Sequence, residues 1–385
     1  MTATLKNSWE PFSGDWALGL RHFPTINGGS FITSSSSGAL ALCCLSSPQE
    51  SVHMNRRAHE SSINALDKID EFTLASASTD GIKVWDLRQS MNRAQLSFTN
   101  TKRSNFLSLG SSAGHLLAGG TELVGSDAEL LLWDLKNPGK VVRSFVDSHH
   151  DDITDIKFHP NLPYLMSGST DGYVNIYNLE EPDEEEALHQ VINFASVHSC
   201  HFVQANRISV LSHMETLAFW ELNNTNYEAQ EEPRPKELGD VRSLWPACEY
   251  VVDISNAGYV AYGANSQSSL TIMPFNAKTE EFSLSGAINL MPAHGEEVVR
   301  DVMYIPGTTS VLTCGEDGLV KAWELPGVLS SGEQVSTDLP LGESPLSKEE
   351  RKEEKRRKKE KKEKKDRKEK KEKKRSKADV RFKPY

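Results

Sequence analysis

SASTDGIKVWDLR, residues 76–88, is the first of three clear copies of one pattern in this 385-residue chain. SGSTDGYVNIYNL (167–179) and TCGEDGLVKAWEL (313–325) repeat it. Each copy joins two runs of alternating apolar residues through a polar turn that contains Asp-Gly, and this dipeptide tolerates the positive φ of a tight hairpin. The pattern therefore predicts a β-hairpin in each copy, with an aromatic residue near the end of its second strand.

The spacing between these copies predicts more of them. Asp80 and Asp171 are 91 residues apart, and Asp171 and Asp317 are 146 apart, which corresponds to two and three repeats of roughly 45–49 residues. Weaker copies fill the intervals: FITSSSSGALALCCL (31–45), GTELVGSDAELLLWDL (120–135), SHMETLAFWEL (212–222) and YGANSQSSLTIMPF (262–275). Seven hairpins in all predict seven structural units.

Another strand precedes the hairpin of each unit, and in three units a histidine precedes that strand. These histidines are His59, His150 and His294, which lie 26, 27 and 29 residues before the aromatic residue of their unit. A repeat of this length, with four short strands and a terminal Trp-Asp, resembles the WD-repeat β-propeller family over residues 1–326. The resemblance implies an all-β, seven-bladed propeller. The order of the motifs is similar to the subgroup that includes WD repeat-containing protein 89 and its fungal counterparts.

The resemblance also implies how the ring closes. In this family the N-terminal segment supplies the outermost strand of the last blade, and residues 3–9 are the candidate here. Residues 16–20 would then form the inner strand of blade one.

Within a blade, the resemblance implies a hydrogen-bond network of a histidine, a Ser or Thr, an Asp and a Trp. In blade two these are His59, Ser76 or Ser78, Asp80 and Trp85; in blade four His150, Ser167 or Ser169, Asp171 and Tyr177; in blade seven His294, Thr313, Asp317 and Trp323. Because the trio recurs from blade to blade and no GxSxG turn is present, a structural role is favoured over a catalytic triad. The sequence also lacks HExxH and GxxxxGK[ST], so we expect no enzyme, no cofactor, no metal site and no small-molecule substrate.

The charges divide sharply between the body of the chain and its C-terminal end. Residues 348–385 contain 22 basic and 10 acidic residues, which leaves 21 basic and 44 acidic residues in 1–347. The body is therefore net −23 and the tail net +12, within a chain of net −11. We expect a propeller over 1–326, a linker over 327–347 and a disordered or helical Lys/Glu-rich tail over 348–385.

Two acidic loops, 179–189 and 223–240, interrupt the predicted blades. They are either solvated linkers or contacts for a basic protein partner. In the second case the candidate contacts are Glu184, Glu185, Glu186, Glu231 and Glu232. The negative body favours a basic partner over a nucleic acid backbone.

The tail is either a solubilising extension or a functional element. Its basic clusters would then act as nuclear or nucleolar signals and contact RNA phosphates without sequence specificity. The clusters consist of Lys355, Arg356, Arg357, Lys358, Lys359, Lys373, Lys374 and Arg375.

Three functions stay open from the sequence. The first is a non-enzymatic scaffold or escort for a basic protein of the ribosomal-protein or histone class. The second is a substrate receptor of a cullin-4 ubiquitin ligase, because Trp85-Asp86-Leu87-Arg88 resembles the WDxR pattern in which Arg88 would contact the adaptor. The third is an RNA-associated ribosome-assembly factor. Five cysteines without disulfide or zinc spacing, no basic-apolar leader and no long apolar run predict a reduced intracellular protein without a membrane partner. We expect it in the nucleus or nucleolus, with the cytoplasm as the alternative.

Overall fold

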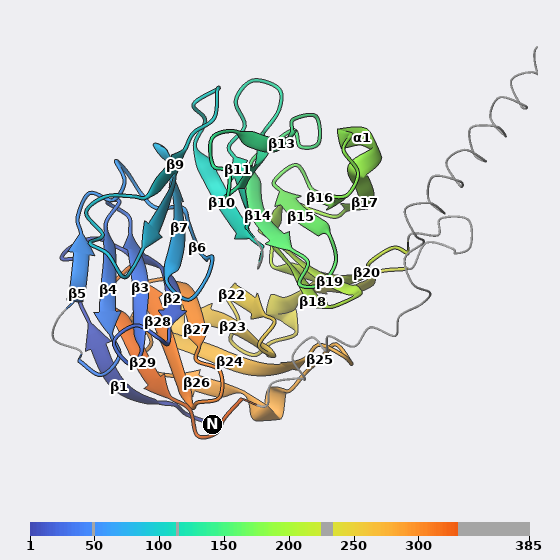
Figure 1. Cartoon of the computed structure of the whole chain (residues 1–385). Helices are drawn as coiled ribbons and strands as arrows, with labels where there is room; N and C mark the ends of the chain where they lie inside the picture. The colour runs from blue at the N-terminus through green and yellow to red at the C-terminus, as the bar shows by residue number, and fades with distance from the viewer. Residues whose placement is uncertain (48–50, 113–114, 225–233, 330–385) are drawn as a thin grey trace, which may run out of the picture. The chain divides into compact units, whose positions relative to one another are not determined.

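The computed structural model describes residues 1–47, 51–112, 115–224 and 234–329. Within them, seven antiparallel sheets stand as blades around a central axis (Figure 1). The predicted seven-bladed, all-β propeller is confirmed. The described residues belong to one compact unit, Met1–Ser336, and the rest of the chain, Thr337–Tyr385, lies outside the described residues.

The first four blades each consist of four consecutive strands. Blade one contains β2 (Ala17–Phe23), β3 (Ser30–Ser35), β4 (Leu40–Cys44) and β5 (Ser51–Asn55). Blade two contains β6 (Ala65–Lys68), β7 (Thr73–Ser78), β8 (Gly81–Asp86) and β9 (Leu96–Phe98). Blade three contains β10 (Phe106–Ser111), β11 (Leu116–Thr121), β12 (Leu130–Asp134) and β13 (Val141–Phe145). Blade four contains β14 (Ile153–Phe158), β15 (Tyr164–Ser169), β16 (Tyr173–Asn178) and β17 (Leu188–Asn193).

The last three blades depart from this plan in small ways. Blade five contains β18 (Val197–Gln204), β19 (Arg207–Ser212), β20 (Thr216–Glu221) and β21 (Lys236–Asp240). Blade six has five strands: β22 (Tyr250–Ser255), β23 (Tyr259–Ala264), β24 (Ser269–Asn276), β25 (Glu281–Phe282) and β26 (Ile288–Leu290). Blade seven combines β27 (Val299–Tyr304), β28 (Ser310–Gly315) and β29 (Val320–Glu324) with β1 (Thr4–Trp9). Short 3-10 turns lie at Val241–Ser243, Asn265–Gln267 and Leu284–Gly286.

β1 closes the ring as the outermost strand of blade seven. Thr4 pairs with Glu324, and Trp9 pairs with Val320. Trp9 is 3% exposed, and its ring meets the ring of Phe31 in blade one edge-on, with centroids 5.0 Å apart. The predicted closure by residues 3–9 is confirmed, because hydrogen bonds and packing both join this segment to its neighbours.

The hairpin turns follow from the Asp-Gly pairs of the sequence. Gly172 and Gly318 have φ values of 89° and 76°, a region that side chains disfavour. A Cβ atom at position 318 would also lie 2.6 Å from the carbonyl oxygen of Asp15. Glycine is therefore required at this turn for space as well as for backbone conformation.

The hydrophobic core is divided among the interfaces between blades. Trp9 and Phe31, for example, belong to one cluster with Leu312 and Cys314, so this cluster joins blades seven and one. All six residues of β3, β15 and β23 are buried, because the middle strands of a blade are covered on both faces. Most exposed side chains therefore lie on the outer strands and the connections, with a few exceptions such as Tyr173 in β16.

α1 (Glu184–Ala187) is an element that the sequence did not predict, since 179–189 was expected to be a loop. Asp183 begins it by accepting hydrogen bonds from the backbone N–H groups of Glu185 and Glu186, at 3.0 and 3.2 Å. Acidic side chains in the first turn favour such a helix, because the N-terminal end of a helix carries partial positive charge. α1 lies at the outer edge of blade four (Figure 1).

Candidate functional site

The His, Ser/Thr, Asp and Trp residues of blades two and seven form continuous chains of hydrogen bonds. In blade two the His59 ring lies 2.5 Å from Asp80 through Nδ1 and 2.6 Å from Ser76 through Nε2, and the Trp85 indole donates to Ser76 at 2.9 Å. Because an ionised carboxylate only accepts, His59 Nδ1 carries the proton and Nε2 accepts from the Ser76 hydroxyl. The choice between Ser76 and Ser78 thus falls on Ser76.

Blade seven repeats the same geometry. His294 Nδ1 lies 2.6 Å from Asp317, His294 Nε2 lies 2.8 Å from the Thr313 hydroxyl, and the Trp323 indole donates to that hydroxyl at 3.0 Å. Burial lowers the pKa of His59 and of His294 by more than the adjacent carboxylates raise it. Both rings are therefore neutral and buried, and they fasten strands of their own blade together.

In blade four the predicted network histidine, His150, is wrong. His149, and not His150, lies between Asp171 at 3.0 Å and Ser167 at 2.7 Å. His150 is exposed and its Nδ1 lies 3.0 Å from Asp127 in the neighbouring blade. The two histidines are adjacent in sequence, and the spacing to Asp171 does not distinguish them, because the other blades use 21 and 23 residues.

Tyr177 replaces the tryptophan of the blade-four network. Its phenol lies near Ser148, Ser167 and Asn175, but it makes no hydrogen bond of normal geometry within the described residues. Burial raises its pKa to about 12, and its ring packs on Phe145 with centroids 4.3 Å apart. Tyr177 therefore contributes the packing of its ring to this blade.

The first strands of the blades line a central channel with a cavity of about 460 Å³. Two oppositely charged pairs lie there, Arg21 with Asp301 at 3.2 Å and Lys157 with Asp155 at 2.6 Å, and His201 lies 3.3 Å from Asp253. Sequence reasoning missed these residues, although they alternate with apolar ones along the inner strands. Alternation alone does not show that these side chains face a central channel, because the channel forms only when the blades close into a ring.

The channel carboxylates hold neighbouring blades together. Asp301 in blade seven accepts from the Leu20 backbone in blade one at 2.8 Å, and Asp155 in blade four accepts from the Cys200 backbone in blade five at 3.0 Å. Burial raises the pKa of Asp301. It also opposes the ionisation of Asp155, but Lys157 and His201 outweigh it and lower the pKa of that carboxyl. Because these groups are committed to contacts between blades, the channel has a structural role.

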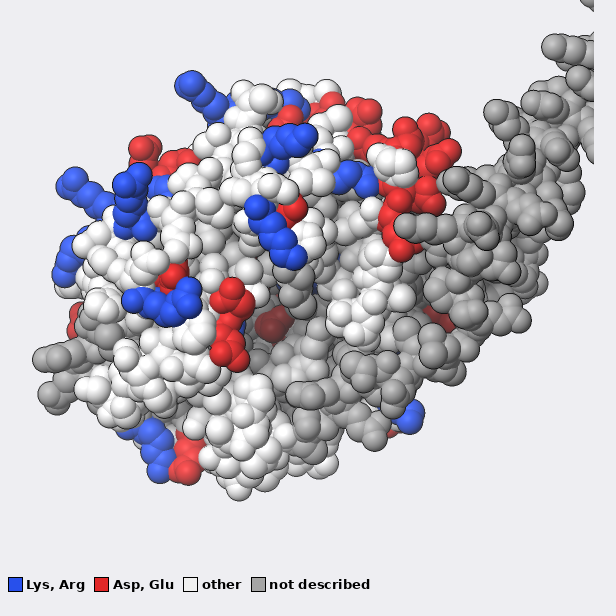
Figure 2. All heavy atoms as spheres, viewed as in Figure 1, with Lys and Arg blue, Asp and Glu red and all other residues white. Residues whose placement is uncertain are grey.

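Blade four concentrates the negative charge of the body. Residues 146–193 contain eleven acidic residues and one basic residue, Lys157. Since Lys157 pairs with Asp155 in the channel, the ten other acidic residues have no lysine or arginine within this segment. Figure 2 shows acidic side chains gathered over α1, at the outer edge of this blade. The predicted contacts Glu184, Glu185 and Glu186 belong to this acidic surface.

A groove of about 620 Å³ lies within the acidic surface. It is lined by the connection before blade four, by one face of β16 and β17, and by α1. The lining residues are Asp147, Ser148, His150, Asp171, Tyr173, Asn175, Asp183, Glu184, Glu185, Leu188 and Val191. Glu184 fixes one wall, because it accepts hydrogen bonds from the Ser148 hydroxyl at 2.8 Å and from the Asp147 backbone at 3.2 Å.

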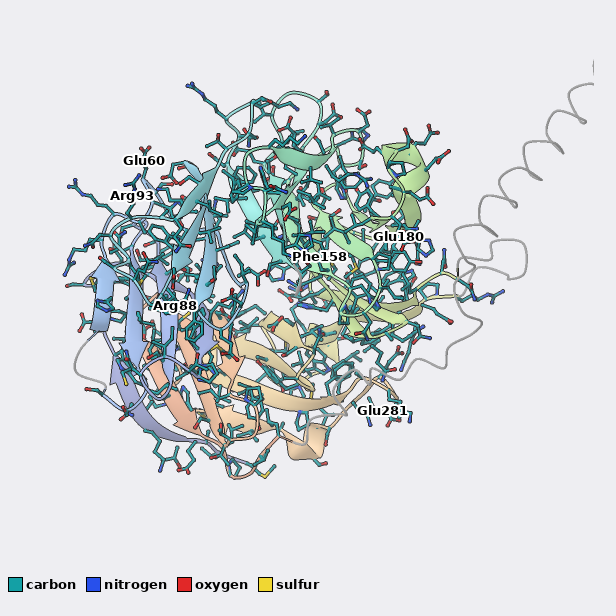
Figure 3. All side chains as sticks on the ribbon, viewed as in Figure 1. Glu60, Arg88, Arg93, Phe158, Glu180 and Glu281 are labelled. Atoms are coloured by element: carbon teal, nitrogen blue, oxygen red, sulfur yellow. The ribbon has the colours of Figure 1, made fainter. Side chains whose placement is uncertain are left out.

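Arg88 lies far from this surface. It follows β8, and it is separated in Figure 3 from Glu180, which precedes α1. Its guanidinium makes two hydrogen bonds of 2.9 Å with Asp86 and lies 5.0 Å from the ring centre of Phe72. The side chain is 62% exposed, so it is accessible while it makes these contacts.

Several predicted site residues lie outside the described residues. These are Glu231 and Glu232 and the tail positions Lys355, Arg356, Arg357, Lys358, Lys359, Lys373, Lys374 and Arg375. Their roles stay predictions. Among the residues that the structure does describe, no three His, Cys, Asp or Glu side chains are placed to hold a metal ion. Nor does a helix in that part of the chain have the length and apolar character needed to cross a membrane.

Comparison with known proteins agrees with this geometry. The family model "WD domain, G-beta repeat" matches residues 139–178 and 287–324. An uncharacterised WD repeat-containing protein of Saccharomyces cerevisiae is 44% identical over 322 residues, which cover 81% of this chain and 79% of that protein. The chain belongs to the WD-repeat family.

Other relatives share this family. The WD repeat-containing protein 89 homolog of Dictyostelium discoideum is 28% identical over 69% of this chain and 72% of that protein. A ribosome biogenesis protein WDR12 homolog of Oryza sativa is 31% identical over a shorter stretch, 31% of this chain and 27% of that protein. Among solved structures, the Cps50 (Swd1) β-propeller domain of Myceliophteria thermophila superimposes with a TM-score of 0.61 at 15% identity. The superposition covers 84% of this chain and 99% of that domain, and it shows a shared fold.

Proposed function

We propose that this protein is a non-enzymatic scaffold or escort whose acidic propeller binds a basic protein of the ribosomal-protein or histone class. One observation carries the proposal: besides Asp155 of the channel, the blade-four segment 146–193 contains ten acidic residues, and its one basic residue, Lys157, pairs with Asp155. A surface of one charge sign speeds association with oppositely charged partners and repels others.

The blade networks support a role without catalysis. Each histidine is buried between an aspartate and a hydroxyl, and in blades two and seven that hydroxyl also accepts a hydrogen bond from tryptophan. A nucleophile in such a place has no access to a substrate. We therefore assign the trios to the stability of the blades, and the exposed surface of blade four to binding.

The proposed location is the nucleus or nucleolus, where ribosomal proteins and histones are assembled. The basic clusters of the tail support this location by their composition, and the tail's charge would allow non-specific RNA contact. The similarity to a ribosome biogenesis protein over 31% of the chain points the same way. A role in ribosome assembly is therefore part of the proposal.

Affinity purification tests the proposal directly. The full chain and a chain ending at residue 346 are each purified at low and high salt, and the retained proteins are identified by mass spectrometry. We expect one basic protein to stay with both chains at moderate salt. If basic proteins are retained only by the full chain and are lost with salt, the tail carries the association and the proposal for the propeller fails.

A second candidate function is a substrate receptor of a cullin-4 ubiquitin ligase. The observation in its favour is that Arg88 is exposed and held in one orientation by Asp86 and Phe72. In this case the full chain co-purifies with the ligase adaptor, and Arg88→Ala abolishes that association. Absence of the adaptor from the purified full chain removes this candidate.

Sedimentation separates an escort from an RNA-associated assembly factor. An escort sediments alone or with one small basic protein. An assembly factor sediments with pre-ribosomal particles and leaves them when RNA is digested.

A further inference from the structure

The groove of blade four has a floor of exposed apolar side chains. Tyr173, Leu188 and Val191 are 38%, 37% and 45% exposed. Tyr173, Asn175 and Tyr177 alternate along β16 and so share one face of the sheet. Val191 and Leu188 of β17 lie on the same face, because they pair with Asn175 and Tyr177. Three large apolar residues side by side on a surface commonly mark a place where another molecule packs.

Among the described residues, no further strand pairs with the outer edge of β17. It is the last strand of its sheet, and none of its six residues, LHQVIN, is charged. Some other outer strands carry charges that discourage contact with other chains, as Lys6 does in β1 and Lys236 in β21, whereas β5 and β9, like β17, carry none. The cavity of about 620 Å³ above this floor falls in the range of roughly 300–1,000 Å³ that is typical of binding pockets.

The rim of the groove selects the charge of what can enter it. Five carboxylates line it, and within the described part of the chain none of them pairs with a lysine or arginine: Asp147, Asp171, Asp183, Glu184 and Glu185. Many other acidic residues of the propeller do have such a partner, as Asp80 has Lys83 and Asp86 has Arg88. Asp171 is 8% exposed and bonded to His149, so it adds little accessible charge. The other four carboxylates offer negative charge that no lysine or arginine of the described residues pairs with.

An apolar floor under an acidic rim fits one kind of side chain. Lysine and arginine have an apolar stem and a cationic end. The stem can cover Leu188 and Val191 while the cation lies near Glu185 and Asp147, and the exposed Tyr173 ring can accept the cation on its face. A purely apolar side chain would leave the rim unpaired, and an acidic one would be repelled.

Building on the proposed function, we propose that this groove is the docking site for an extended, lysine- or arginine-rich segment of the partner protein, with one basic side chain inserted between the apolar floor and the acidic rim. Histones and ribosomal proteins are candidate partners because they contain such basic segments.

A binding assay with defined peptides tests this site. The probe is a fluorescein-labelled peptide of alternating lysine and valine, and a peptide of alternating glutamate and valine is the charge control. Each is titrated with the full chain and followed by fluorescence anisotropy. Two variants change the groove: Val191→Lys on the floor, and the pair Asp147→Lys with Glu185→Lys on the rim. The side chains of these rim residues make no hydrogen bond or ion pair that supports the fold in the described structure.

A matched variant separates the groove from overall charge. Glu60→Lys with Glu281→Lys makes the same change in net charge at exposed positions away from blade four (Figure 3). We expect the floor variant and the rim variant each to weaken binding of the lysine peptide at least about tenfold, and the matched variant to weaken it less than about threefold. Circular dichroism of all variants verifies that the fold is retained.

Three outcomes overturn the groove assignment. If the floor and rim variants bind the lysine peptide as tightly as the matched variant does, the groove is not the binding site, although the protein can still bind basic partners elsewhere. If the unmodified chain prefers neither the lysine peptide nor intact histones over the glutamate peptide, the proposed function fails as well. The third outcome is measured with a photo-crosslinking residue at position 191. Crosslinks to the lysine peptide support the site. Crosslinks only to residues 348–385 of the same chain would show that the groove binds the tail instead.

Discussion

At the scale of single residues, the hydroxyl at the centre of each blade network is the group whose removal should lower the free energy of unfolding most. In blade two, Ser76 contacts both the His59 ring and the Trp85 indole. Ser76→Ala leaves both nitrogens buried without that partner, and we expect a loss of about 1–3 kcal/mol in the free energy of unfolding, measured by urea denaturation. Ser209→Ala is the control, because Ser209 is also buried but its hydroxyl has no hydrogen-bond partner in the described structure. Equal effects of the two substitutions would contradict the account.

The histidine pair of blade four gives a second test of the same principle. His149→Ala removes the contacts to Asp171 and Ser167, so we expect it to lower the free energy of unfolding by about 1–3 kcal/mol. His150→Ala changes an exposed side chain and should cost no more than about 0.5 kcal/mol. Thermal denaturation of both variants measures the difference in their stability. A larger effect at His150 would restore the prediction made from the sequence.

The same networks make stability depend on pH. Burial lowers the pKa of His59 and His294 in the folded state, so the unfolded chain binds more protons as the pH falls below about 6.5. Acidification from pH 7.5 to pH 5.5 should therefore lower the melting temperature. The variant with both His59→Gln and His294→Gln should show a smaller decrease over this interval. A melting temperature that rises on acidification, or an equal decrease in the variant, contradicts this assignment.

At the scale of elements, closure of the ring depends on how firmly β1 is fixed. Trp9 is 3% exposed and packs on Phe31, whereas Trp16 is 45% exposed and lies 5.5 Å from the Arg300 guanidinium. Trp9→Ala should cost about 3–5 kcal/mol, and Trp16→Ala about 0.5–1 kcal/mol. Denaturation curves of the two variants measure the difference. Similar values would show that the end of β1 does not anchor the ring.

The elements also show where sequence reasoning works and where it stops. The hairpins could be predicted from Asp-Gly turns, alternating apolar residues and the repeat length, whereas the closing strand was implied only by the resemblance to the WD-repeat family. α1 was not predicted, since one helical turn stabilised by Asp183 has no periodicity to detect. The groove could not be predicted either: Asp147 and Glu184 are 37 residues apart, and only the packing of α1 against the preceding connection brings them together. His149 and His150 were confused because both satisfy the same spacing.

At the scale of the whole molecule, the body's charge of −23 is unevenly distributed. The segment 146–193 alone has a net charge of −10, and it surrounds a groove whose floor is apolar. General negative charge would give weak binding to any basic partner that disappears with salt. A local groove predicts a preferred orientation, because one blade contributes both the charge and the shape.

Amide hydrogen exchange of the full chain, alone and with saturating core histones, tests this central claim most directly. We predict that protection upon binding is concentrated in 146–152 and 183–193, the segments that form the walls and floor of the groove, and that blades one and two change little. Protection confined to other blades, with blade four unchanged, would contradict the account.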